Sequence, residues 1–569
     1  MKRIALFLTC TLCVVMNSVA YDIVVESGKN VYDALQTVRN LRRLGNTTEA
    51  YNIILSGGTY VLDEPLVLRP EDGGASPAGS LTIKSAEGAQ AIISGAATIT
   101  NWKREGKLWV STPQGRACFA SPIRQLWVNG KKAVRATQFG EYKLDRMADF
   151  NAINRTITIP TPKNIKQLKK AARLEMLVHQ RWAIAILRVK EMKELTDGNT
   201  EVTFLEPESH LEFLHPWPQP IINGEKGSSS YCLQNALCLL DEPGEWYEDE
   251  AGKIYYYPLD GEDMKTADVK VARLERLLSI EGSPLAKVCN INIEGITFEY
   301  AAWNRPNTKG HVTLQGGFAI TEAYKLKDAG LPWNPNLENQ AWIERPDAAV
   351  RAEWCEGIRF SNCTFRHLAA TGLDFRTGVK KSQIDGNTLT DIGGTAIMAG
   401  SFAEGATEVH NPLTISNEEY TEDIRIANNT ISDATNEDWG AVGIGAGYVR
   451  HTTIEGNDVS HVNYSGICVG WGWTAHDTGM RDNHIDNNKV RDFARMLYDA
   501  GGIYTLSNQP ESTIKGNTIE DLCDSPYATN DRGFYIYLDE ATDGYTISNN
   551  KCTQQKFGDN KPGPKVVWK

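Results

Sequence analysis

Two aspartates near the end of the chain, Asp499 and Asp539, lie in phrases that also carry tyrosines. From Phe534 to Asp539, apolar residues alternate with two tyrosines and the aspartate. Strand side chains point alternately to opposite faces, so we expect Tyr535, Tyr537 and Asp539 to face outward and the apolar residues to face the core. Paired carboxyl groups can cleave a glycosidic bond, and aromatic rings can stack on a sugar. The phrases therefore predict a carbohydrate-cleaving site.

Two segments rich in tryptophan could add sugar contacts. The glycine-rich loop 470–476 carries two indoles and a histidine, and exposed indoles offer flat apolar faces, so we expect a sugar platform there. Segment 301–348 interrupts the strands, and its aromatic content is not typical of disorder. We expect it to form one wall of a binding cleft. The predicted binding residues of these two segments are Trp303, His311, Gln315, Trp471, Trp473 and His476, with Trp333 and Trp342 beside them.

A repeated phrase organises the stretch from Ile384 to Asn550: Asn, any residue, then Leu, Ile or Val. A repeat of roughly 20–50 residues indicates a solenoid. Short β-branched runs punctuated by Gly, Asn and Asp are typical of strands, and two or three per repeat predict an all-β, right-handed parallel β-helix. Asparagine tolerates left-handed backbone angles, and stacked amides can form a hydrogen-bonded ladder. The repeated positions are Asn387, Asn429, Asn457, Asn488 and Asn517, with looser copies at Asn362 and Asn550.

Aligning the coils on these asparagines places Ile503 beside Ile536. The residues one position later then share an outer column, which we expect to present rings, small residues and carboxylates to a sugar. The predicted column consists of Asp374, Gly445, Cys468, Tyr504 and Tyr537, and of these Asp374 and the two tyrosines are predicted to bind substrate.

The alignment also bears on the separation of the two acids. Neighbouring coils lie about 4.8 Å apart, and retaining glycosidases hold their carboxyl groups about 5–5.5 Å apart. Asp499, however, lies four residues before Ile503, whereas Asp539 lies three residues after Ile536. Because these two isoleucines are aligned, the two acids would be offset by roughly 20 Å on straight strands. We therefore expect the glycine corner at 501–502 to bend Asp499 inward. Three further acids are candidates for the second position: Glu540 in place of Asp539, Asp531, and the more distant Asp438.

The chain before residue 281 is predicted to contain three other parts. Residues 1–20, with two basic residues, an apolar run and a small-residue end, are typical of a secretory signal peptide. Residues 21–118 contain short strands of the first coils, and Val31–Leu44 is predicted to be a helix that caps them. Residues 119–280 lack the repeat and contain hairpin signals, which predict an inserted β-sandwich-like domain. The main β-helix with the cleft is predicted to span 281–569.

Composition restricts the partners. The net charge of −12 argues against nucleic acid and against simple electrostatic capture of a polyanion. The nine cysteines left after the signal peptide are an odd number without zinc-site spacing, so we expect buried thiols and neither a metal nor another cofactor. No later stretch is apolar enough for a membrane helix. We expect an exported, secreted or periplasmic protein, monomeric, whose partner is an oligosaccharide or polysaccharide.

Six phrases together resemble β-helix carbohydrases, most of all glycoside hydrolase family 141. The resemblance covers nearly the whole chain past Tyr21. It implies a retaining exo-α-L-fucosidase that acts on plant cell-wall glycans, pectic or xylan, or a xylan-cleaving enzyme (xylanase or xylosidase) as in other members. The phrases are Gly58–Leu62, Leu126–Gly130, Pro243–Tyr247, Gly295–Phe298, Asp499–Thr505 and Gly533–Asp539.

Other functions of β-helix proteins make different predictions. The Asn-Thr-Asp, Asp-Asp, Gly-His-Gly and Arg-Ile-Lys phrases of polygalacturonases are absent. A polysaccharide lyase of this fold would need a basic residue beside an acidic calcium site, and Arg495 is the basic residue that comes nearest to the outer column. A non-catalytic glycan-binding protein would have no close pair of outward carboxylates.

Overall fold

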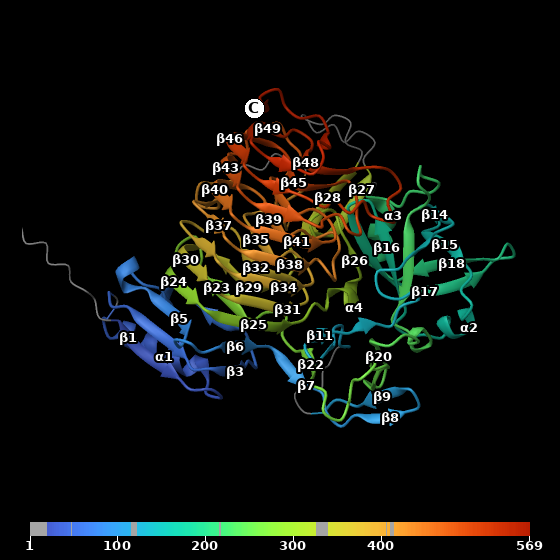
Figure 1. The fold of residues 1–569 in the computed structure, drawn as a ribbon, viewed down its shortest axis with the longest axis horizontal. Helices are drawn as coiled ribbons and strands as arrows, with labels where there is room; N and C mark the ends of the chain where they lie inside the picture. The colour runs from blue at the N-terminus through green and yellow to red at the C-terminus, as the bar shows by residue number, and fades with distance from the viewer. Residues whose placement is uncertain are drawn as a thin grey trace, which may run out of the picture.

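The chain forms a β-helix, whose coils stack along one axis so that their strands make three parallel sheets. The β-helix carries an inserted domain (Figure 1). This confirms the predicted all-β fold class. The predicted signal peptide, apart from Ala20, lies outside the described residues, as do Cys118 and Trp333. The structure is a computed structural model that describes residues 20–46, 48–114, 122–215, 218–325, 339–405, 407–409 and 415–569.

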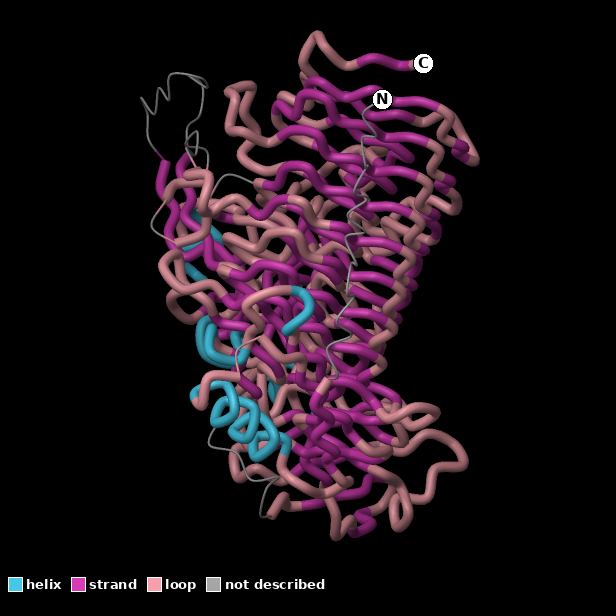
Figure 2. Tube along the Cα trace, turned by 90° about the vertical axis from the view of Figure 1, so that its left-hand side faces the viewer, coloured by secondary structure: helices cyan, strands magenta, loops and turns pink. Residues whose placement is uncertain are grey.

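A complete coil contributes one strand to each of the three sheets, and successive coils stack in register (Figure 2). Sheet A has 13 strands, from β1 (Tyr21–Val25) to β52 (Val567–Trp568). Three of these strands, β1, β36 (Thr421–Glu422) and β52, are additional to the one per complete coil. Sheet B has 10, from β3 (Gly58–Val61) to β50 (Lys551–Cys552). Sheet C, also of 10, consists of β4 (Leu66–Leu68), β23 (Leu278–Glu281), β29 (Ala348–Glu353), β32 (Thr371–Phe375), β35 (Ile397–Ala399), β39 (Ile444–Ala446), β42 (Ile467–Val469), β45 (Ala500–Thr505), β48 (Gly533–Leu538) and β51 (Phe557–Asp559).

The turn from sheet A to sheet B carries the predicted asparagine ladder. From Asn387 to Asn550, each side-chain amide donates to the side-chain oxygen of the asparagine in the next coil, at 2.9–3.0 Å. Asn362 does not belong to this ladder. It adopts the left-handed conformation itself, with φ 52°, and the backbone N–H of Cys363 takes the ladder position by donating to Asn387 at 2.9 Å.

The interior of the β-helix is a continuous apolar core. Inward-facing isoleucines of sheet C stack coil on coil, and burying each contributes about 1.5–3 kcal/mol. These isoleucines, all 0 % exposed, are Ile397, Ile444, Ile467, Ile503 and Ile536.

One prediction about the strand β48 is wrong. Tyr535 points into the core, where it packs edge-on against Phe493, and Phe534 points outward against Tyr537. The neighbouring strand β45 has glycines at positions 501 and 502. Because glycine has no side chain, the side chains of β48 can depart there from the strict alternation between the two faces of the sheet. Tyr537 does face outward, as predicted.

The first coils are covered by the helix α1 (Val31–Arg43), close to the predicted bounds. Its first turn is capped by Asn30, whose side chain accepts from the Tyr32 N–H at 2.9 Å. Each of the eight described cysteines is a free thiol. Among the described residues, no helix is both long and apolar enough to cross a membrane.

The inserted domain is mainly antiparallel, with one parallel pair, β12 (Val134–Arg135) with β20 (Glu245–Glu248). Its outermost pair is β7 (Ala96–Thr98) with β22 (Val269–Ala272), so antiparallel pairing begins before residue 119 and ends before residue 280. The central hairpin of its largest sheet joins β16 (Glu175–Gln180) to β17 (Ala183–Glu194). Two short helices, α2 (Ile165–Leu168) and α3 (Glu208–Leu214), also belong to the domain.

The segment after β25 (Ile296–Ala301) links the inserted domain to sheet C. It forms α4 (Arg305–Lys309), then β26 (His311–Val312), which pairs with β17 of the inserted domain. A hairpin of β27 (Ala319–Lys325) and β28 (Asn339–Glu344) follows. The segment is thus fixed to the inserted domain at one end and returns to the β-helix at β29.

Candidate active site

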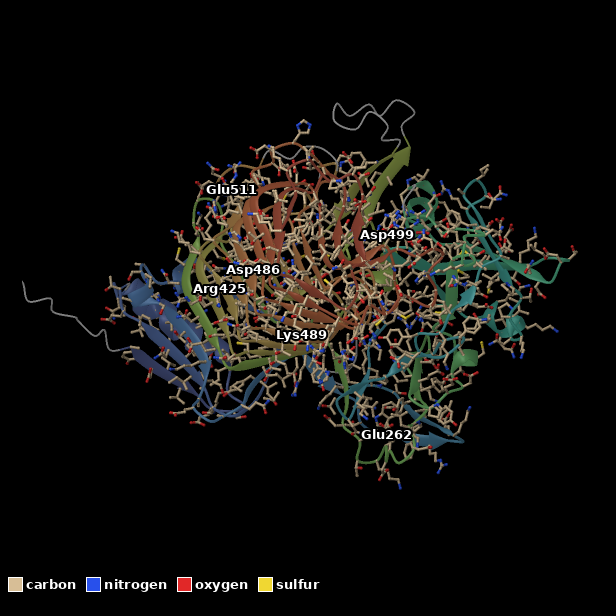
Figure 3. All side chains as sticks on the ribbon, turned by 45° about the horizontal axis from the view of Figure 1, so that its top comes forward. Glu262, Arg425, Asp486, Lys489, Asp499 and Glu511 are labelled. Carbon is tan, nitrogen blue, oxygen red and sulfur yellow. The ribbon has the colours of Figure 1, made fainter. Side chains whose placement is uncertain are left out.

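Asp499 and Asp539 lie at opposite ends of two neighbouring strands of sheet C. Asp499 immediately precedes β45, and Asp539 immediately follows β48. In Figure 3, Asp499 lies on the side of the β-helix next to the inserted domain, whereas Asp486, Arg425 and Glu511 lie on the opposite side. The acid pair therefore belongs to the face that the inserted domain borders.

The predicted outer column of sheet C is confirmed by the strand pairing. Tyr504 lies beside Tyr537. The pairing also adds members that the alignment did not name, and Met398 is the one between two that it did name. In order along the axis the column is Val67, Ser279, Arg351, Asp374, Met398, Gly445, Cys468, Tyr504, Tyr537 and Gly558.

Two tyrosines connect the acids in spite of their offset along the strands. The Tyr537 hydroxyl donates to Oδ1 of Asp499 at 3.0 Å, and the Tyr504 hydroxyl donates to Oδ2 of Asp539. The two rings meet edge-on with centroids 5.2 Å apart. The expected inward bend occurs at Asp499 itself, with φ 58°, in the left-handed region that aspartate tolerates better than most residues. The hydroxyl of Tyr464 donates to the Asp499 carbonyl oxygen at 3.1 Å and holds this conformation.

The two carboxyl groups have different electrostatic surroundings. Burial raises the pKa of Asp499, opposed by the guanidinium of Arg532, by the Tyr537 hydrogen bond and by Arg181. Nε of Arg532 donates to Oδ1 of Asp499 at 2.8 Å. Burial also raises the pKa of Asp539, and here the hydrogen bonds that oppose it come from neutral groups.

Asp539 is held by uncharged donors and is influenced by its neighbour. Besides Tyr504, the amide of Asn560 donates to its Oδ1 at 2.7 Å. The negative charge of Asp499 raises the pKa of Asp539 further, so the two groups are electrostatically coupled. Only 7 % of Asp499 and 8 % of Asp539 is exposed. Both carboxyls are thus buried, but only Asp499 accepts a hydrogen bond from a cation.

The alternative acids lie outside this cluster. The carboxylate of Glu540 pairs with Lys561 at 3.0 Å, and the exposed Asp531 pairs with Lys556 at 2.6 Å. Asp438 lies two coils earlier, where its Oδ2 is 2.9 Å from Nε2 of His311. Arg495, the basic residue considered for a lyase, lies 3.6 Å from Asp492.

The expectation that Asp374 presents an open carboxylate to substrate is wrong. Arg345 binds both its oxygens, at 2.6 and 2.7 Å, and only 1 % of Asp374 is exposed. Arg345 comes from the end of segment 301–348, and no local pattern in the sequence connects it to β32. Asp374 therefore serves to anchor that segment on sheet C.

The loop 470–476 only partly matches the predicted platform. Trp471 is 3 % exposed because Phe318 and Phe402, from two other loops, pack on its ring at 5.2 and 5.1 Å. Trp473 is half-buried and packs with the tyrosine pair on the outer face. His476 is exposed on the surface of the loop. The indole next to the acid cluster is thus Trp473.

The segment 311–318 reaches the acid cluster through Gln315. Its side-chain amide donates to the hydroxyl of Tyr464 at 3.4 Å, and this hydroxyl donates to the Asp499 carbonyl. The Trp182 indole of the inserted domain donates to the Leu314 carbonyl at 2.8 Å and fixes this segment. Gln315 is therefore placed beside the cluster, as the predicted cleft wall requires.

His311 and Trp303 lie in a neighbouring cavity of 340 Å³. Their rings meet at 89° with centroids 4.8 Å apart, and both are largely buried. Asp438 lines the same cavity. These two predicted binding residues thus lie beside Asp438. Of the residues that the structure describes, those that line this cavity do not include Tyr504 or Tyr537.

The inserted domain supplies a contribution that sequence reasoning missed. The turn between β16 and β17 packs on the coil before β45, where the Tyr498 N–H donates to the Arg181 carbonyl at 3.0 Å. Arg181 also acts electrostatically on Asp499. The sequence shows a strand ending in Gln-Arg-Trp, but nothing in that phrase indicates that it meets residues more than 300 positions later.

Comparisons with known proteins agree with this architecture. A family model described as the GH141 insertion domain matches residues 106–259, and one described as a right-handed β-helix region matches residues 413–561. None of the functionally curated proteins matches the sequence.

A solved structure described as a glycoside hydrolase is 35 % identical, with a TM-score of 0.93 over 96 % of each chain. A complex of XylC with xylose is 12 % identical over 94 % of this chain and 70 % of that one, with a TM-score of 0.45. A tailspike protein of E. coli bacteriophage HK620 is 11 % identical over 52 % of this chain and 45 % of that one, with a TM-score of 0.30. The last two are too distant to indicate function. The first shows that this chain belongs to the glycoside hydrolases, and its insertion domain is of the GH141 type.

Proposed function

We propose that the protein is an exported, retaining exo-α-L-fucosidase of plant cell-wall glycans, in which Asp499 and Asp539 are the two reacting carboxyl groups. One observation carries the assignment of the pair: each carboxyl accepts a hydrogen bond from one of two touching tyrosines on the outer face of sheet C, Asp499 from Tyr537 and Asp539 from Tyr504. Two acids that share one partly buried site are the arrangement that glycoside hydrolysis requires.

The difference in surroundings assigns the roles. Arg532 and Arg181 favour the ionised form of Asp499, so Asp499 is the nucleophile. Asp539 is held by neutral donors beside a negative charge, so it keeps a proton and is the general acid. Environments that push two pKa values apart are how such pairs divide acid and nucleophilic work.

The reaction proceeds in two steps. Asp539 gives its proton to the glycosidic oxygen while an oxygen of Asp499 bonds to the anomeric carbon, and the bond to the leaving group breaks. Asp539, now ionised, takes a proton from water, whose oxygen attacks the same carbon and breaks the bond to Asp499. Arg532 stabilises the carboxylate that leaves in this second step.

The choice of sugar, the exo mode and export rest on other support. Trp473 and Phe534 pack against the two tyrosines that bind the acids, and the acids themselves are buried, which suits one terminal sugar better than the middle of a polymer. The resemblance to family 141 supports α-L-fucose and a plant cell-wall glycan. The pattern of residues 1–20 supports export, to the periplasm or outside the cell.

Aryl glycosides test this proposal directly. The protein is incubated with aryl α-L-fucoside, β-xyloside and α-L-arabinoside, and the anomer released first is followed by NMR. We expect hydrolysis of the fucoside, with α-L-fucose as the first product. Release of the β-anomer would show inversion and overturn the roles of the two acids. Cleavage of the xyloside alone would replace the fucosidase assignment by a xylan-cleaving one.

A further inference from the structure

The cavity that contains His311 and Trp303 lies outside the reaction site just described. Its volume of 340 Å³ lies within the usual range of about 300–1,000 Å³ for small-molecule sites. The walls come from α4 and the segment around His311 on one side, and from the turns that enter β32, β35 and β39 on the other. It is therefore built by the same long segment that reaches the acid cluster through Gln315.

Three side chains of this cavity each have a buried polar atom with no hydrogen-bond partner among the described residues. They are Nδ1 of His311, Oγ1 of Thr371 and Nε of Arg305. Thr371 is 0 % exposed and His311 2 %. Buried polar groups are nearly always hydrogen-bonded, because leaving one unbonded is costly. Donors and acceptors that converge on one cavity without partners suit a ligand rich in hydroxyl groups.

The charged groups of the wall are already paired, which points to a neutral ligand. Glu275 is the exception, and burial raises the pKa of its carboxyl, which favours the uncharged form. An anionic sugar would therefore find no free cation to replace its hydration among the described residues of the wall. The pairs are Glu344 with Arg305 and Lys309, Arg345 with Asp374, Asp347 with Arg276, and Asp438 with His311.

The cavity lies within reach of the acid cluster. Asp438 precedes β39 and Asp499 precedes β45, with only β42 between those strands. Two coil steps correspond to roughly 10 Å along the axis. Thr371, at the start of β32, lies four coil steps from β45, or roughly 19 Å. Gln315 follows the cavity residue His311 by four positions and donates to the Tyr464 hydroxyl, which in turn donates to the Asp499 carbonyl.

We propose that this cavity is an aglycone subsite of the hydrolase, which binds a neutral sugar residue of the substrate beyond the bond that is cleaved. The inference rests on the proposed function, since the terminal sugar is placed at Asp499 and Asp539. His311 Nδ1 and Thr371 Oγ1 form hydrogen bonds to the hydroxyl groups of this residue. The enzyme thereby selects a neutral glycan chain over a free monosaccharide conjugate.

The substitution Thr371→Val tests the subsite. Valine has nearly the shape of threonine, and the hydroxyl that it removes has no partner among the described residues. We expect kcat/KM for a fucosylated xyloglucan oligosaccharide to fall about fivefold, the usual worth of one neutral hydrogen bond. Hydrolysis of aryl α-L-fucoside stays unchanged, and the thermal midpoint does not fall. An equal loss on both substrates would contradict a separate subsite.

A matched control is Thr452→Val in sheet A. Thr452 is equally buried, but its hydroxyl donates to the Arg450 carbonyl at 3.2 Å. We expect this variant to lose stability and to keep the oligosaccharide kinetics of the unchanged protein. The pair of variants thus separates a loss of binding from a loss of folding.

Direct binding separates this proposal from the proposed function. Calorimetry on the Asp499→Asn protein measures binding of the same neutral oligosaccharide and of an oligogalacturonide. Binding of the neutral probe that Thr371→Val weakens supports the subsite, even if the unchanged protein hydrolyses no fucoside and the proposed function fails. Preference for the oligogalacturonide, binding that Thr371→Val leaves unchanged, or no binding of either probe overturns the subsite.

Discussion

The asparagine ladder and the acid cluster belong to the same β-helix but hold different polar groups. The ladder holds neutral amides that are hydrogen-bonded from coil to coil, whereas the cluster holds two buried carboxyl groups. In the ladder, Asn457 accepts from Asn429 and donates to Asn488 and to the Ile426 carbonyl. The coils from Asn387 to Asn517 repeat the side-chain bond to the next asparagine with the same neutral group. In the cluster, two carboxyls are buried between aromatic rings, and burial raises the pKa of each.

The difference separates stability from reactivity. A neutral amide with all its hydrogen bonds made stabilises the turn that it occupies. A buried carboxyl is less stable in its charged form than the same group in water, and it can therefore give up or accept a proton near the working pH. Regular coils thus stabilise the protein on one edge and leave the opposite face free to carry groups that differ from coil to coil.

The largest expected effect comes from Asp499→Asn, which keeps the shape of the cluster and removes the nucleophile. We expect kcat for aryl α-L-fucoside to fall by roughly 10⁴-fold or more, with an unchanged circular dichroism spectrum. Added azide restores turnover and gives the glycosyl azide of inverted configuration.

Asp531→Asn is the matched control, because Asp531 is exposed and paired with Lys556. Its activity stays near that of the unchanged protein. If the Asp499 variant keeps its activity, or if the Asp531 variant loses it, Asp499 is not the nucleophile and the acid cluster is not the reactive region of the β-helix.

The next largest effect is a loss of stability, which we expect from Asn457→Ala in the ladder. The change removes the acceptor of the Asn429 backbone N–H and of one side-chain N–H of Asn429, and it removes the donor to the Ile426 carbonyl. We therefore expect the free energy of unfolding to fall by about 2–4 kcal/mol. The midpoint of guanidinium unfolding measures it, and kcat of the folded enzyme stays unchanged.

Asn550→Ala serves as the comparison within the ladder. Asn550 is only half-buried and donates to the Ile514 carbonyl alone. We expect a smaller loss of stability there. If Asn457→Ala and Asn550→Ala lower the free energy of unfolding equally, then a second neighbouring asparagine in the ladder does not add to stability.

The smallest expected effect is a shift of the pH profile in Arg532→Met. The guanidinium of Arg532 lowers the pKa of Asp499, so its removal raises that pKa. Because the nucleophile must be ionised, the acid limb of kcat/KM against pH moves to higher pH.

The control is Arg425→Met, which breaks an ion pair with Asp385 on the other side of the β-helix and leaves the profile in place. A shift of the alkaline limb in Arg532→Met would instead exchange the roles of Asp499 and Asp539.

The repeat, the ladder and the outer column were predictable from sequence because they depend on local spacing. Each ladder asparagine sits at the same turn, so counting from it fixes which residues stack. The pairing of Tyr504 with Tyr537 follows from that count alone.

Contacts between distant segments were not predictable in the same way. Trp471 is buried by Phe318 and Phe402, and Asp374 is covered by Arg345. Each of these neighbours comes from a loop whose path the repeat does not determine. The reversal at Tyr535 likewise depends on the glycines of the preceding coil.

The position of the reacting groups along the chain has a consequence for synthesis. Asp499, Arg532, Asp539 and Asn560 are all translated after the inserted domain and most of the coils. A chain that emerges from the ribosome N-terminus first can thus stack this part of its scaffold before the two acids are made. Growing chains remain inert until Asp539 has been translated and its coil has folded.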